Sequence, residues 1–334
     1  MSGILAREQR SSLIAIALIV AGLLTFSFIT TNNLGSFSIT IFSGLLRGML
    51  LFLVASGLSI VFGLMDVLNF AQGAYFMIGA YVGYEIHHAP SLIEAIPDGN
   101  LRFLLGIIVA VIVGGGLGVL LERALLRPLY ARPIFQIVTT FGVSIIMVEV
   151  VKLIWGISPR SWNTKFGFND GYFQLFEQQF SVYRLFVIGI GFLLIITVSL
   201  LLSRTRIGII IRAGVQDSQM VEALGINVRL IFTGVFALGC ALAAFGGVIA
   251  APFLGANPSL GTEFLLGAIA AVVLGGLGSY EGTAIAALMV GLTQAVIAKF
   301  TTQYLNMPVF ESLSPMVLLA LVLLVRPSGL FGRE

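Results

Sequence analysis

Long apolar stretches alternate with short polar gaps along most of the chain. A helix that crosses a bilayer needs about 20 predominantly apolar residues. The stretches that approach this length cover residues 12–30, 42–62, 70–86, 103–122, 135–156, 184–203, 230–252, 264–279, 283–299 and 309–325. The pattern predicts an all-α polytopic membrane protein with about 8–10 transmembrane helices. The gaps around Asp66 and around Tyr280 are so short that re-entrant or broken helices are alternatives there.

Basic residues gather in alternate gaps, which predicts an orientation. A cytoplasmic N-terminus places most of them inside: Arg7, Arg10, Arg123, Arg127, Arg132, Arg204, Arg206, Arg212, Arg229, Arg326 and Arg333. The opposite gaps hold only Arg102, Arg160, Lys165 and Arg184, together with Glu85, Glu94, Asp98, Asp170, Glu177 and Glu311. Because cytoplasmic loops carry the excess of Lys and Arg, both termini are predicted to be cytoplasmic.

Composition supports the membrane class. The chain is 58% hydrophobic and only 10% charged, against about 25% charged residues in soluble domains. No long soluble stretch interrupts the spans, so residues 1–334 are predicted to form a single transmembrane domain whose first helix is not cleaved. The net charge of +3 reflects topology rather than nucleic-acid binding. Cys240 has no cysteine partner and is predicted to be a small packing residue.

A charged and amide-rich segment, residues 212–229, stands out between two apolar walls and falls on the predicted cytoplasmic side. Asp217 or Ser218 can cap a helix start, and Gly225 suits a left-handed helix end. The predicted two-turn helix places Met220, Ala223 and Leu224 on one apolar face. Such a face fits a groove on a partner, and the alternative is that the helix lies along the membrane surface.

Several ordered blocks carry a family resemblance. DSQMVEALGINV resembles the coupling loop of ABC importer permeases, with matches at Asp217, Glu222, Ala223, Gly225 and Ile226. The blocks ASGLSIVFGLMDVLNFAQGAYFMIGAY, ERALLRPLYARP, EFLLGAIAAVVLGGLGSYEGTAIAALMVGL and VRPSGLFG are similar to those of branched-chain amino acid permeases, which are related to ribose-type permeases. One departure is Ala71-Gln72-Gly73, where many relatives have Ala-His-Gly.

The resemblance implies a permease subunit of an ATP-driven importer in a bacterial inner membrane. It implies a second permease, two cytoplasmic ATPase subunits and an extracytoplasmic binding protein as partners, besides the lipid bilayer. The ATPase-coupling loop would span about 204–229 and act through Asp217, Met220, Glu222, Ala223, Leu224, Gly225 and Ile226. None of Lys152, Lys165 and Lys299 follows a glycine, so the chain has no G-K-[ST] phosphate loop; ATP and Mg²⁺ would be bound by the partner ATPase.

Branched-chain or related amino acids are the implied substrates, and urea, amides or aromatic acids are alternatives on the same scaffold. A stand-alone gradient-driven carrier would not need the coupling loop. An intramembrane enzyme is disfavoured, since the sequence shows no nucleophile, metal or paired-carboxylate motif.

Two further groups of residues are candidates for the transport route. Asn69, Gln72 and Gly73 lie in one of the tight gaps and are candidates for the translocation path, because broken helices point to substrate routes. The alternative is hydrogen bonding between helices. Gly275, Gly276 and Gly278, in the other tight gap, are candidates for a gate, and a simple turn is the alternative.

The remaining charged and aromatic residues have structural interpretations. Glu149 and Lys152 are predicted to form an ion pair, and Arg47 is expected to snorkel to the outer surface. His87 and His88 are expected to be solvated. The aromatic residues of the outer gap at 158–182 are typical of an interfacial belt or a docking surface for a binding protein.

Overall fold

The computed structural model describes residues 2–31, 33–162, 167, 171–175, 178–205, 208–211, 213, 218–305, 307 and 309–332. The helices are α1 (Ser2–Thr31), α2 (Leu34–Met65), α3 (Gln72–His88), α4 (Pro90–Ala95), α5 (Gly99–Leu121), α6 (Pro133–Trp155), α7 (Val182–Arg204), α9 (Ser218–Ala223), α10 (Val228–Leu254), α11 (Leu260–Gly275), α12 (Tyr280–Phe300) and α13 (Val309–Val325). Short π and 3-10 turns are η1 (Glu122–Leu126), η2 (Arg127–Leu129) and η3 (Thr301–Leu305), and the strands are β1 (Tyr172–Leu175) and β2 (Gln178–Ser181).

Each predicted apolar stretch overlaps one long helix, so the all-α polytopic fold class is confirmed. Within the described residues, six helices are long and apolar enough to cross a membrane. Both tight gaps are breaks between separate helices. Residues 66–71 separate α2 from α3, and residues 276–279 separate α11 from α12.

The β1–β2 hairpin was not predicted. It pairs antiparallel with Phe173 opposite Phe180, and these two rings stack at 5.4 Å between centroids. The outer gap was interpreted only through its aromatic content. The alternation of aromatic and polar residues around Phe173 and Phe180 was the available strand signal.

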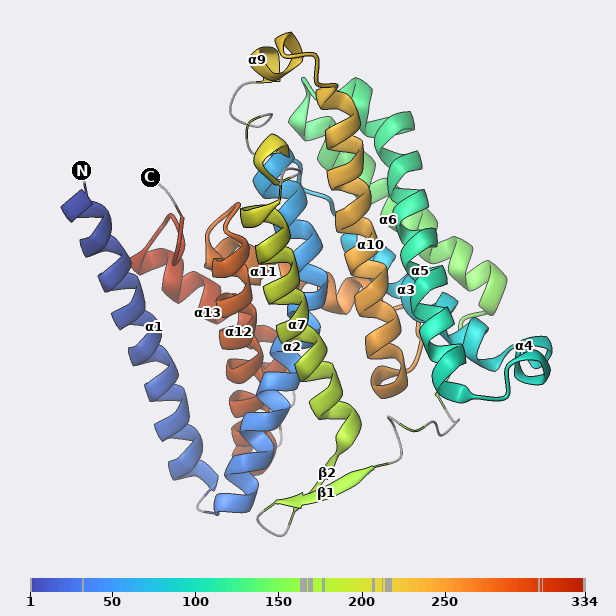
Figure 1. Ribbon diagram of the computed structural model, residues 1–334. Helices are drawn as coiled ribbons and strands as arrows, with labels where there is room; N and C mark the ends of the chain where they lie inside the picture. Colours follow the sequence, from blue (N-terminus) through green and yellow to red (C-terminus); the bar gives the residue numbers. More distant parts are fainter. Residues whose placement is uncertain are drawn as a thin grey trace.

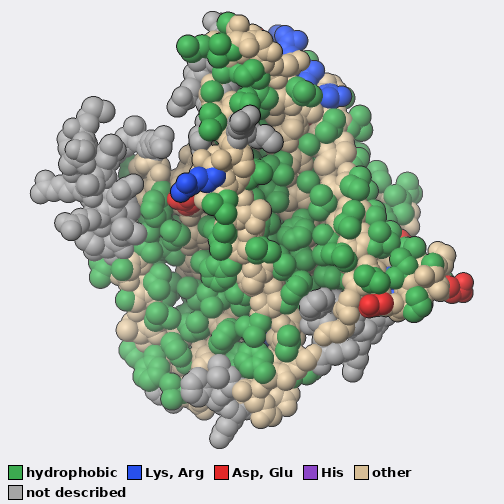
Figure 2. Space-filling view, in the orientation of Figure 1, with side chains coloured by type: hydrophobic (Ala, Val, Ile, Leu, Met, Phe, Trp, Pro, Cys, Tyr) green, Lys and Arg blue, Asp and Glu red, His purple; other side chains and the backbone are tan. Residues whose placement is uncertain are grey.

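Different elements lie at the two ends of the bundle (Figure 1). Helix α9 stands at one end, whereas α4 and the hairpin lie at the opposite end, and both chain ends lie toward the α9 side. The Lys and Arg side chains in view in Figure 2 also lie toward the α9 end, and most Asp and Glu side chains lie toward the α4 end. This distribution follows the charge asymmetry expected from the sequence.

Helix α10 packs against α2, α3 and α5 at the centre of the bundle. Glycines allow this contact: a Cβ on Gly247 would lie 1.9 Å from the carbonyl oxygen of Phe76, and one on Gly79 would lie 2.0 Å from that of Ala244. Backbones that approach this closely gain dispersion contacts where lipid supplies no hydrophobic drive. Cys240 is fully buried in this contact, as predicted.

Helix α6 has its apolar side chains outside and its polar ones inside. Gln136, Thr140 and Ser144 are buried at one-turn intervals, while Ile146 and Leu153 are 62% and 86% exposed. Thr140 accepts a hydrogen bond from the backbone N–H of Phe70 at 3.2 Å. A helix that faces lipid satisfies its polar groups against neighbouring protein, so this pattern is expected for a membrane span.

One expectation about a single side chain is wrong, and another gains a partner. His87 is fully buried, so the expected solvation is wrong for this residue. The reason is the Trp162 ring, whose centroid lies 4.7 Å from that of His87 and which comes from a distant gap. Arg47 forms an ion pair with Glu311 of α13, so its charge is met by another helix.

The α3–α10 contact predicts a matched pair of stability effects. Gly247→Ala places a methyl group against the Phe76 carbonyl, and overpacking of this kind costs about 1–3 kcal/mol. Gly234→Ala is the control in the same helix, because nothing lies within 4 Å of its added Cβ. We expect a lower midpoint of thermal unfolding in detergent for Gly247→Ala and an unchanged or raised midpoint for the control. Equal midpoints would contradict the assigned packing.

Candidate functional site

The predicted short helix is present at the end of the bundle that carries the basic residues. α9 is followed by a turn in which Gly225 adopts φ +81°. The N–H of Gly225 donates to the carbonyl of Glu222 at 2.9 Å, and that of Ile226 donates to Val221 at 3.3 Å. These bonds and the left-handed glycine make the helix end that the sequence predicted. Asp217 lies outside the described residues.

The apolar face of α9 is directed outward. Met220 is 65% and Leu224 is 72% exposed, and they lie one turn apart, so we call these two side chains the apolar tip of α9. α9 itself stands at one end of the bundle (Figure 1). Glu222 and Ala223 are also exposed, and Ile226 is half-buried. Val221, which the sequence analysis did not single out, is buried and faces inward. α9 therefore presents two large apolar side chains at the surface.

The turn after α9 leads directly into α10. The side chain of Asn227 accepts a hydrogen bond from the N–H of Leu230 at 3.2 Å and caps α10. α9 and the start of α10 are also in contact. Because only a short turn separates the two helices, a displacement of α9 would act on the first turns of α10.

A buried carboxylate lies behind those first turns. Glu122 is fully buried in η1. It accepts hydrogen bonds from the Tyr130 hydroxyl at 2.6 Å and from the Thr233 hydroxyl at 2.7 Å. Arg127 lies with its Nε 3.5 Å from the same carboxylate and donates from Nη2 to Thr233 at 3.0 Å. We call these four residues, Glu122, Arg127, Tyr130 and Thr233, the Glu122 network.

The Glu122 network joins two parts of the fold. Glu122, Arg127 and Tyr130 belong to the connection between α5 and α6, and Thr233 belongs to α10. Burial and the hydrogen bond to Glu122 raise the pKa of Tyr130 well above its ordinary value, so its hydroxyl remains a donor. The sequence analysis used Arg127 only for topology. The signal for the network was the Glu122–Arg127 spacing in ERALLRP.

The candidate path residues are enclosed. Asn69 and Gln72 are both fully buried. The Asn69 amide donates to Gln72 at 3.1 Å, and Gln72 donates to the carbonyl of Gly239 in α10 at 2.8 Å. A Cβ on Gly73 would lie 2.0 Å from the carbonyl oxygen of Gly261. In this conformation the three residues are packed between helices, and Gln72 makes a hydrogen bond to another helix. Their role in the translocation path stays a prediction.

The candidate gate glycines form a compact turn. Gly276 and Gly278 have φ values of +98° and +84°, which favour glycine. A Cβ on Gly275 would lie 2.5 Å from the backbone of Gly282. The C-terminal segment holds the turn, because Leu330 and Phe331 donate backbone hydrogen bonds to Leu274 and Gly275 at 2.9 and 3.1 Å.

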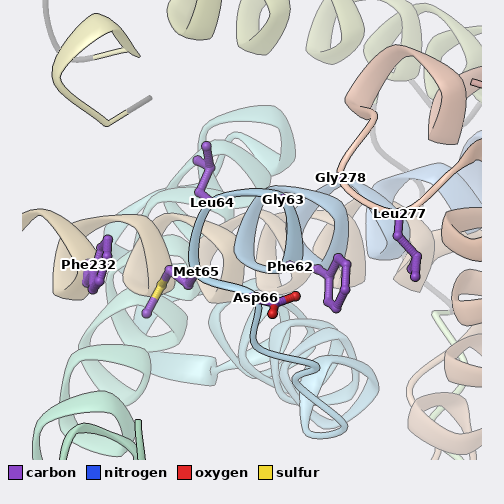
Figure 3. Close-up of a pocket in the computed structure, with 8 residues that line it drawn as sticks. All are labelled: Phe62, Gly63, Leu64, Met65, Asp66, Phe232, Leu277 and Gly278. Atoms are coloured by element: carbon purple, nitrogen blue, oxygen red, sulfur yellow. The ribbon is translucent and has the colours of Figure 1, made fainter. Parts of the chain in front are cut away.

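A pocket of about 380 Å³ brings the two tight gaps together (Figure 3). It is lined by Phe62, Gly63, Leu64, Met65, Asp66, Phe232, Leu277 and Gly278. Asp66 ends α2 in a left-handed conformation, and its N–H donates to the carbonyl of Phe62, so it is the C-cap residue of that helix. Gly278 from the candidate gate and Asp66 therefore border the same hollow.

No group of three or more His, Cys, Asp or Glu side chains that could hold a metal ion occurs among the residues that the structure describes.

The family model and the similar proteins agree on one family. Residues 40–326 match the family model described as the permease component of a branched-chain amino acid transport system. The chain is 30% identical over 297 residues to the high-affinity branched-chain amino acid transport system permease protein LivH of Escherichia coli K12, covering 87% of this chain and 94% of that protein. It is 31% identical over 298 residues to BraD of Pseudomonas aeruginosa, with the same coverage. The galactose/methyl galactoside import permease protein MglC of Escherichia coli is 30% identical over 227 residues, covering 63% of this chain and 64% of that protein.

The Glu122 network predicts a coupled loss of stability. Glu122→Ala leaves buried donors without an acceptor, at a cost of about 1–3 kcal/mol for each. Thr233→Val removes one donor and should cost less. Because the residues share one network, the double variant should be less destabilised than the sum of the single variants. Thermal unfolding in detergent measures all three, with exposed Glu94→Ala in α4 as the control. Additive effects would contradict the network.

Proposed function

This chain belongs to the family of permease components of branched-chain amino acid transport systems, and we propose that it is the membrane-spanning subunit of an ATP-driven importer. Its proposed substrates are branched-chain or related amino acids. Urea, amides or aromatic acids are the alternatives. The relatives include a galactose/methyl galactoside import permease by name, so similar chains are named for chemically different substrates. The chain is a multi-pass membrane protein, and the proposed location is the plasma membrane of a bacterium.

The α9 tip is the observation that carries the proposal. Met220 and Leu224 are exposed at the end of the bundle where the basic residues gather. An apolar helix face in water is stabilised when it enters a groove on a partner. The positive-inside rule assigns this end to the cytoplasm, where the partner ATPase would bind.

The sequence indicates that another subunit binds ATP. No lysine of this chain follows a glycine, so the P-loop that cradles nucleotide phosphates is lacking. ATP and Mg²⁺ are therefore proposed to bind two partner ATPase subunits. A second permease and an extracytoplasmic binding protein complete the proposed importer.

The contacts suggest how ATPase movement reaches the membrane. Force on α9 acts first on the start of α10, since Asn227 caps that helix directly after the α9 turn. Thr233 then couples α10 to the α5–α6 connection through Glu122. Helices α5, α6 and α10 would thus move together when the ATPase engages or releases α9. A stand-alone carrier has no use for an exposed apolar tip at this position.

Two changes of charge at the α9 turn test the proposal. Glu222→Arg changes an exposed side chain, and Leu224→Asp places a charge in the apolar tip; neither disturbs the buried Val221. We expect a loss of about 2 kcal/mol of ATPase binding, roughly 30-fold in affinity, with loss of ATP-driven uptake in proteoliposomes. Co-purification of the ATPase subunits measures the binding.

The matched control is Glu94→Arg, which is the same exchange in an exposed six-residue helix at the opposite end of the bundle. It should leave ATPase co-purification unchanged. Normal ATPase binding and normal uptake by both variants, Glu222→Arg and Leu224→Asp, would contradict the proposed coupling role.

A further inference from the structure

An ion pair lies within the membrane-spanning part of the fold. Arg47 of α2 pairs with Glu311 of α13, and the two side chains are still 38% and 30% exposed. This chain therefore covers only part of the pair. A charged side chain within a bilayer is costly, and it almost always faces the interior of a helix bundle or a water-filled cavity. The exposed side of the pair thus requires surroundings other than hydrocarbon.

Packing contacts and helix lengths give the depth of the pair. A Cβ on Gly291 of α12 would lie 2.1 Å from the backbone nitrogen of Gly48, the residue after Arg47. Gly291 lies nine residues before the end of α12, which is about 14 Å at a rise of about 1.5 Å per residue. Glu311 is in the first turn of α13, a helix only about 25 Å long, whereas the hydrocarbon core is about 30 Å thick. Both charges therefore lie below the surface of the bilayer.

Arg47 is the deepest accessible position on α2, counted from the start of that helix. Ser43 and Arg47 lie one turn apart on one side of α2, and both are half-buried. Every residue from Gly48 to Val61 is buried. The accessible strip of α2 therefore stops at the ion pair, and the tightly packed part of the helix lies beyond it.

A third charged residue lies at the same depth on α11. This helix packs beside α2, and both run toward the pocket in Figure 3. A Cβ on Gly267 would lie 2.6 Å from the side chain of Leu51. Glu263 and Arg47 each lie one turn before these two residues, and Glu263 is exposed. Three helices, α2, α11 and α13, thus expose charged side chains at one level.

Water fits these exposed charges better than lipid or a dry protein contact. Lipid is disfavoured by the cost of a charge in hydrocarbon. A second chain in dry contact would bury the rest of the ion pair, and the desolvation cost is then offset only if further hydrogen bonds satisfy both groups. Ser312, the neighbour of Glu311, is also exposed, so polar groups continue on this side of α13.

We propose that the face of α2 and α13 around Arg47 and Glu311 lines the water-filled route through the importer, with the ion pair on its wall. This inference rests on the proposed importer function and locates the route on this chain. Water solvates the exposed side of each charge, and the partner side chain satisfies the other side. The lipid-facing side of α6, at a similar depth, has no such water.

Cysteine labelling measures water at this depth. The complete importer in nanodiscs carries either Arg47→Cys or Ser43→Cys, and the second variant leaves the ion pair intact. It is treated with a charged, membrane-impermeant methanethiosulfonate, and mass spectrometry gives the rate of labelling. The native Cys240 is fully buried and is the unreactive internal control.

Ile146→Cys is the matched control on the lipid-facing side of α6. Ile146 is 62% exposed and lies nine residues before the end of its helix, as Gly291 does in α12. The thiolate is the reactive form, and apolar surroundings raise the pKa of a thiol. Since each pKa unit lowers the thiolate fraction about tenfold, we expect Arg47→Cys and Ser43→Cys to be labelled at least about tenfold faster than Ile146→Cys.

Slow labelling of both α2 variants would overturn the proposal, because lipid or a second chain then covers this face. Equal labelling of Ile146→Cys would contradict it as well, because water would then not be confined to the α2–α13 face.

ATP-driven uptake distinguishes a route from a closed crevice. Unlabelled Ser43→Cys should transport normally, and the attached group should abolish most of its uptake by obstructing the route. The same treatment should leave uptake by Ile146→Cys unchanged. Full uptake after complete labelling of Ser43→Cys would overturn the assignment to the route. Labelling needs neither ATP nor cargo, so fast labelling in a complex without ATP-driven uptake would refute the proposed function and leave a water-lined face.

Discussion

The close contact of α10 with α2, α3 and α5 is the constraint on which the rest of the structure depends. Gly239, Gly246 and Gly247 leave no room for a side chain on the faces that meet α2 and α3. Lipid is as apolar as leucine, so helices in a membrane are held by close packing and hydrogen bonds rather than by exclusion of water. The small residues of α10 allow this close packing, which makes α10 the central helix of the bundle.

α10 connects the two ends of the bundle. It begins one residue after Asn227, beside α9, and it ends at Leu254, just before the loop whose Ala256 pairs with Arg160. The Glu122 network ties the start of α10 to the α5–α6 connection, and the Arg160–Ala256 bridge ties its end to the loop after α6. α6 is therefore linked to α10 at both ends.

Several polar residues of the spans form hydrogen bonds to other helices inside the protein. Gln72 reaches the carbonyl of Gly239, and Thr283 donates to Ser59 at 3.0 Å between α12 and α2. A buried polar group in a membrane is costly without a partner, so these bonds also specify which helix faces meet. The same requirement explains why α6 turns Gln136 and Thr140 inward and its branched apolar side chains outward.

The amino-acid sequence by itself determined the positions of the apolar helices and the α9 turn. Each of these depends on local properties: the length of an apolar run, and a glycine that tolerates φ > 0. Ser218–Ala223 with Gly225 could be predicted because a helix and its end are set by neighbouring residues. The contact sites depend on residues far apart in the chain.

Only the tertiary structure decided that Glu122 meets Thr233, that His87 lies against Trp162, and that Arg47 pairs with Glu311. It also decided that Asn69, Gln72 and Gly73 lie packed between helices. In a membrane protein nearly every helix is apolar on all of its faces, so the periodicity of apolar residues does not show which face meets which neighbour. That choice is made by the fit of glycines against backbone and by the partners available to each buried polar group.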